Sequence, residues 1–70
     1  MKKYSVYTVF KNGQDMQFET NTNVLLLQPF NVNGAKMIMT KDQYGVNMAQ
    51  VKKLEVVEIG HGKIGEIVNP

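Results

Sequence analysis

Residues 3–20 read KYSVYTVFKNGQDMQFET, and this stretch decides the fold. Residues 3–10 are rich in β-branched and aromatic side chains, which favour strands. Residues 14–20 alternate between apolar and polar side chains, as expected for a half-buried strand. Between the two lie Asn12 and Gly13, a dipeptide that accepts the positive φ values of a type I′ turn. The stretch therefore predicts a β-hairpin.

Two further strands are expected after the hairpin. Residues 24–30 (VLLLQPF) carry apolar side chains on both faces, which is typical of a central or interface strand. Pro29 places the second half of this strand at a sheet edge, because proline cannot donate a ladder hydrogen bond. The second Asn-Gly pair, at 33–34, leads into a strand over residues 35–40. Residues 42–45 (DQYG) have the Asp-first, Gly-last pattern of a type I turn.

The segment that follows allows two interpretations. Residues 47–52 are expected to form one helical or 3₁₀ turn, and residues 53–59 the last main strand, because β-branched side chains dominate there. A helix over residues 47–58 is the alternative, since Met48, Val51 and Leu54 recur at helical spacing.

These elements predict an all-β fold with a single small domain over residues 1–59. Residues 60–70, which hold three of the six glycines, are expected to form a Gly-rich C-terminal tail or arm. Five strands with one short helical turn before the last strand are typical of a strongly bent sheet or an SH3-like barrel. A chain of this size buries only about 60% of its unfolded surface. Because the chain has no cysteine and cannot form a stabilising disulfide, a homo-oligomer is expected.

Residues suited to catalysis are scarce. The chain has no cysteine and one histidine, His61, which lies between two glycines that would not orient it. The six carboxylates are scattered. Gly60, Gly62 and Gly65 match a dinucleotide fingerprint in spacing, but only five residues follow, too few for the helix that motif requires. We therefore expect no enzymatic activity, no cofactor and no metal site.

The charged residues are eight lysines and six acids, without arginine, for a net charge of +2. The lack of arginine weakens a nucleic-acid interpretation, because arginine reads phosphates and bases bidentately. Small barrels nevertheless bind single strands with lysines and exposed rings. The residues expected to serve that alternative are Lys3, Tyr7, Lys52 and Lys53.

The apolar residues indicate a function more directly than the lysines do. The longest apolar run covers residues 24–27, far too short to span a membrane, so a cytoplasmic protein without a membrane partner is expected. The strands carry more apolar side chains than one small barrel encloses, and internal methionines add adaptable surface. A protein partner, from the host or a second copy, is expected to cover the surplus. The expected interface residues are Tyr7, Val9, Leu25, Leu27, Met37 and Met39.

The hairpin KYSVYTVFKNGQDMQFET and the closing VNMAQVKKLEVVEI resemble small all-β accessory proteins encoded by phages, prophages and plasmids of low-GC Gram-positive bacteria. The resemblance implies an accessory protein that binds nucleic acid or blocks a host protein. The first expectation is a non-enzymatic protein-binding module, an inhibitor or modulator of a host or defence protein. The alternative is a single-stranded nucleic-acid binder, and the third is a structural or assembly component that forms a closed oligomer.

Overall fold

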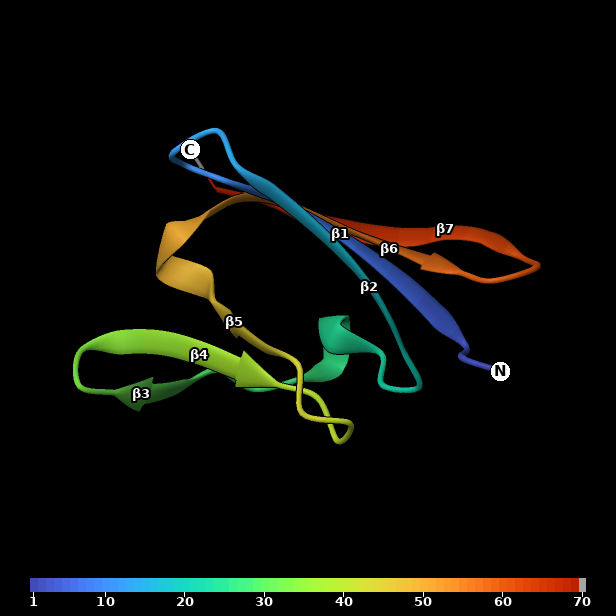
Figure 1. Ribbon diagram of the computed structural model, residues 1–70, viewed down its shortest axis with the longest axis horizontal. Coiled ribbons are helices and arrows are strands. Elements are labelled where there is room, and N and C mark those ends of the chain that lie inside the picture. The colour runs from blue at the N-terminus through green and yellow to red at the C-terminus, as the bar shows by residue number, and fades with distance from the viewer. Residues whose placement is uncertain (70) are drawn as a thin grey trace.

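The computed structural model, which describes residues 1–69, contains two antiparallel β-sheets (Figure 1). A four-stranded sheet has the strand order β2-β1-β6-β7, and a three-stranded sheet has the order β3-β4-β5. The all-β class is confirmed, but seven strands replace the five expected, and no strand pairing among residues 1–69 closes a barrel. The elements are β1 (Tyr4–Phe10), β2 (Asp15–Thr20), η1 (Val24–Leu26), β3 (Phe30–Val32), β4 (Ala35–Met39), β5 (Gly45–Asn47), η2 (Met48–Gln50), β6 (Val51–Glu58) and β7 (Gly62–Val68), where η1 and η2 are 3₁₀ turns.

The first hairpin, β1 and β2, is confirmed, although its turn differs from the type I′ turn expected. Gly13 N–H donates to Phe10 O at 3.0 Å, and Phe10 N–H donates to Gln14 O at 2.8 Å. Gly13 has a φ of 89°, whereas Asn12 keeps a negative φ. This is a three-residue loop, a type I turn closed by a left-handed glycine. The Asn12 side-chain oxygen accepts from Gln14 N–H at 3.0 Å and stabilises the longer loop.

The strand expected over residues 24–30 is wrong. Asn23 caps a 3₁₀ turn instead, because its side-chain oxygen accepts from Leu25 N–H at 3.1 Å. Short polar side chains offer the backbone this local alternative to a sheet ladder. Val24 is buried, and Leu26 points outward with 77% of its surface exposed. The next strand, β3, begins only after Pro29.

The two turns of the three-stranded sheet are also set by positive φ values. Asn33 and Gly34 have φ values of 49° and 84°, which gives the type I′ turn between β3 and β4. The second turn spans Thr40 to Gln43, not residues 42–45 as expected, because Gln43 N–H donates to Thr40 O at 3.0 Å. Gln43 itself has a φ of 72°, a conformation normally taken by glycine.

Residues 47–58 form a 3₁₀ turn followed by a strand, as the first interpretation expected, and the helix over residues 47–58 is wrong. Strand β6 lies at the centre of its sheet, between β1 and β7. Most of the segment expected as a C-terminal tail or arm is strand β7, paired along β6. Asn69 continues this pairing by donating its N–H to Lys52 O at 2.9 Å. Pro70, the last residue of that expected tail, lies outside the described residues.

The hydrophobic core lies between the two sheets. Its fully buried members include Val6 and Leu54 from the four-stranded sheet, and Ile38 and Val46 come from the three-stranded sheet. The sheets also meet where the rings of Phe18 and Tyr44 stack, with centroids 4.5 Å apart. Each sheet therefore has one face committed to the core and one face turned outward. The two outward faces differ in chemistry.

Candidate functional site

The outward face of the three-stranded sheet is apolar. Strand pairing sets Phe30 beside Met37 and Val32 beside Ala35, and alternation along β4 puts Met39 on the same side. Phe30, Val32 and Met39 are 47%, 45% and 48% exposed, respectively. We call this surface the apolar face, made of Phe30, Val32, Ala35, Met37 and Met39.

Charged side chains are nearly absent from this part of the chain. Residues 30–39 contain a single charged residue, Lys36. Lys36 pairs with Asn31, one position out of step with the apolar face, and so lies on the opposite side of β4. On the face itself, both methionine side chains end near Gly45, since a Cβ there would lie 3.5 Å from Met39 Cε and 3.7 Å from Met37 Cε. The methionines therefore cover β5 with flexible apolar surface.

The outward face of the four-stranded sheet is charged and internally paired. Lys53 Nζ lies 2.9 Å from a Glu55 oxygen, and Lys63 Nζ lies 3.0 Å from Glu66 and 3.4 Å from Glu55. The hydrogen bond with Glu55 raises the pKa of Lys53, and the hydrogen bond with Lys63 lowers the pKa of Glu66. Two cations and two anions balance here, so this cluster carries no net charge.

Of the four residues expected to bind nucleic acid, two already contact acidic side chains. Tyr7 and Lys53 share the charged outward face, but the Tyr7 hydroxyl donates to Asp15 at 2.8 Å and Lys53 is paired with Glu55. Lys52 is exposed and lies next to Lys53, at the point where β6 shifts register against β1. Lys3 lies before β1, with its Nζ 5.8 Å from the centroid of the Tyr4 ring.

The six residues expected to form a protein interface divide among three places. Tyr7 and Val9 lie on the outward face of the four-stranded sheet, and Leu25 and Leu27 are partly buried against the core. Only Met37 and Met39 belong to the apolar face. Phe30, Val32 and Ala35 were missed. The signal for them was the turn at Asn33-Gly34, which fixes the register that aligns them with the methionines.

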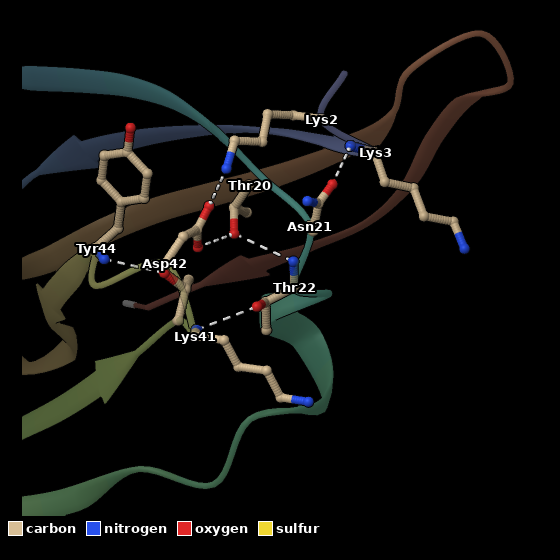
Figure 2. Close-up of polar contacts among 9 residues, drawn as sticks. Lys2, Lys3, Thr20, Asn21, Thr22, Lys41, Asp42 and Tyr44 are labelled. Atoms are coloured by element: carbon tan, nitrogen blue, oxygen red, sulfur yellow. Dashed lines mark hydrogen bonds and ion pairs between the residues drawn. The ribbon is translucent and has the colours of Figure 1, made fainter.

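A cleft at the junction of the two sheets gathers polar side chains (Figure 2). At its centre, Asp42 accepts from the Thr20 hydroxyl at 2.6 Å and pairs with Lys2 Nζ at 2.9 Å. These hydrogen bonds, the one from Thr20 first, hold the pKa of Asp42 well below its usual range. The hydrogen bond from Lys2 to Asp42 raises the pKa of Lys2. We call this place the junction cleft. It has a volume of about 420 Å³ and is lined by Asn21, Thr22, Lys41 and Asp42.

Backbone donors tie three segments together around this cleft. Lys3 N–H donates to Asn21 Oδ1 at 3.1 Å and links the start of the chain to the loop after β2. Lys41 N–H donates to Thr22 Oγ1 at 3.3 Å and links the same loop to the turn after β4. Thr22 N–H donates in turn to Thr20 Oγ1 at 3.1 Å. The cleft is thus held between segments distant in sequence.

Neither a metal-ion cluster nor a membrane-spanning helix occurs in the described part of the chain. Residues 1–69 contain no group of three or more His, Cys, Asp or Glu side chains placed to hold a metal ion. None of the helical turns within the same residues is long and apolar enough to cross a membrane. Comparison of the chain with protein-family models, curated proteins and solved structures found no match.

Proposed function

We propose that this protein is a non-enzymatic binding module that contacts a protein partner through the apolar face. The observation that carries the proposal is the exposure of Phe30, Val32 and Met39, each close to one half, on a sheet face without charges. Protein interfaces are depleted in charge at their centres and enriched in aromatic residues and methionine. Contiguous exposed apolar patches on small proteins commonly mark such contacts.

The energy available from this face is moderate. Covering the exposed half of Phe30, Val32 or Met39 gains about 1 kcal/mol each, because full burial of such a side chain gains about 1.5–3 kcal/mol. Association costs several kcal/mol in lost translational and rotational freedom. Polar contacts around the face must therefore contribute to the affinity.

A second copy of the chain is the partner we favour. Two copies that meet through their apolar faces bring no like charges together, because Lys36 lies on the opposite side of β4. A domain of this size is marginally stable alone and gains from a partner subunit. An inhibitor or modulator of a host or defence protein, as in small accessory proteins of phages, would offer the same face to a different protein.

Light scattering on a size-exclusion column at low and high salt tests this proposal. We expect a dimer whose mass does not depend on salt, because apolar contacts are only weakly screened. Met39→Lys should give a monomer, whereas Leu26→Lys, the same change at an exposed position outside the face, should remain a dimer. A monomeric wild type at both salt concentrations, or a Met39→Lys variant that remains a dimer, would refute the second copy as partner. A larger closed ring would instead favour an assembly component.

The nucleic-acid alternative has weaker support. Acids neutralise Lys53, and the Tyr7 hydroxyl donates to Asp15. Single-stranded DNA in the same scattering experiment provides the test, since phosphate binding weakens steeply with salt. A shift that appears only at low salt and disappears in Lys52→Glu would favour this alternative.

A further inference from the structure

The junction cleft has an unequal balance of hydrogen-bond donors and acceptors. Its side-chain acceptor oxygens already receive protein donors: Asp42 from Thr20 and Lys2, Asn21 Oδ1 from Lys3 N–H, and Thr22 Oγ1 from Lys41 N–H. Each of these oxygens therefore already accepts a hydrogen bond from the protein.

The donors of the same cleft remain available. With its oxygen bound to Lys3, the Asn21 amide keeps its NH₂ group, and the Thr22 hydroxyl keeps its hydrogen. The Lys41 ammonium forms no ion pair with any residue from 1 to 69. In Figure 2 its side chain extends past Thr22, and no dashed line reaches its side-chain nitrogen. Three lining residues thus offer donors that find no acceptor among residues 1–69.

The charge of the cleft favours an anion in the same way. Asp42 is the only acid in its lining, and Lys2 balances its charge at 2.9 Å. Lys41 is then left as an uncompensated cation. The Lys41 ammonium would repel a metal ion or other cation. Both oxygens of the Asp42 carboxylate already accept hydrogen bonds.

We propose that the junction cleft binds an oxyanion, the carboxylate or phosphate group of a small ligand. The Lys41 ammonium supplies the charge, and the Asn21 amide and the Thr22 hydroxyl supply directional hydrogen bonds. Hydrogen bonds to charged groups are the stronger class, which makes such a set selective. A volume of about 420 Å³ matches the size of small-molecule sites. This inference does not depend on the apolar face.

The test follows ¹H–¹⁵N correlation spectra of the whole chain during titration with inorganic phosphate and, separately, with acetate, at constant ionic strength. We expect saturable shifts at the Asn21 side-chain amide and at the backbone amides of Thr22 and Lys41. Lys41→Met should weaken binding about tenfold or more, in line with the loss of one charged hydrogen bond. Asn21→Asp should abolish binding and keep the fold, because a carboxylate oxygen still accepts from Lys3 N–H.

Lys11→Met is the matched control. It removes the same charge from the turn at the far end of β1 and should leave anion affinity unchanged (Figure 1). Shifts that remain linear with concentration, or that spread over all exposed lysines, would overturn the proposal. So would equal weakening in Lys11→Met and Lys41→Met. Peaks that move with phosphate but not with acetate would narrow the ligand to a phosphate group.

Discussion

Replacing Gln43 by glycine should stabilise the protein. Gln43 is exposed and has a φ of 72°, in the left-handed region that costs an L-residue about 1–2 kcal/mol. Glycine adopts this conformation without that penalty, but its greater freedom in the unfolded chain costs about 0.5–1 kcal/mol. The difference leaves a net gain of about 0.5–1 kcal/mol. For a domain of this size, such a gain raises the Tm by about 4 °C.

Two other glycine substitutions serve as controls. Asn33→Gly changes a residue with a φ of 49°, but asparagine tolerates the left-handed region, so a smaller effect is expected. Lys41→Gly lies in the same turn as Gln43 at a negative φ and should lose about 0.5–1 kcal/mol. Thermal and urea denaturation measure the stability of all three variants. An unchanged denaturant slope, m, shows that only the free energy of unfolding has changed. A lower Tm for Gln43→Gly, or equal shifts in the three variants, would refute the argument.

Three further predictions concern the core and the junction cleft. Thr8→Val should stabilise by about 1 kcal/mol, because the fully buried Thr8 hydroxyl has no hydrogen-bond partner among residues 1–69; a lower urea midpoint would contradict this. Leu54→Ala, which removes a fully buried side chain, should cost about 3 kcal/mol, whereas Leu26→Ala at an exposed position should cost under about 0.5 kcal/mol. Because the pKa of Asp42 is lowered in the folded state, its stabilising effect is present above the unfolded value of about 4 and is lost as the pH falls below it. Urea midpoints from pH 2 to 7 should therefore fall less steeply in Asp42→Asn, and parallel profiles would exclude this role.

Local signals predicted the parts of the fold that local chemistry determines. The alternation in residues 14–20 predicts β2, and a helical turn within residues 47–52 is found at Met48–Gln50, because neighbouring residues decide both. Residues 24–30 were predicted as a strand from their apolar content alone. One side-chain hydrogen bond, from Leu25 N–H to Asn23, turns the chain into a 3₁₀ turn there. Such a bond is not visible in an apolar pattern.

The glycines of the C-terminal segment predict a tail or arm. In the structure, two of them belong to strand β7. Gly62 has a φ of 108°, which an L side chain rarely adopts. A Cβ at Gly65 would lie 2.7 Å from Leu25 Cδ1, so glycine leaves space for the leucine of η1. This close approach joins residues 40 positions apart and depends on tertiary packing.

The candidate site was only partly predictable. Met37 and Met39 followed from alternation, but their neighbours Phe30 and Val32 required the correct register of the hairpin. The junction cleft required more still, because Lys2 and Asp42 meet only once both sheets are in place. No pattern of residue spacing in the sequence predicts the contact between Lys2 and Asp42.

The position of β1 between β2 and β6 bears on how the chain folds. Tyr7 pairs with Gln17 on one side, across a short loop, and with Glu55 on the other, across most of the molecule. The first pairing closes in microseconds, but an isolated hairpin is marginally stable in water. The second pairing joins β1 to β6, which is far away in sequence, and such long-range pairing slows folding. During synthesis, the edge of β1 that pairs with β6 therefore stays unpaired until β6 has left the ribosome.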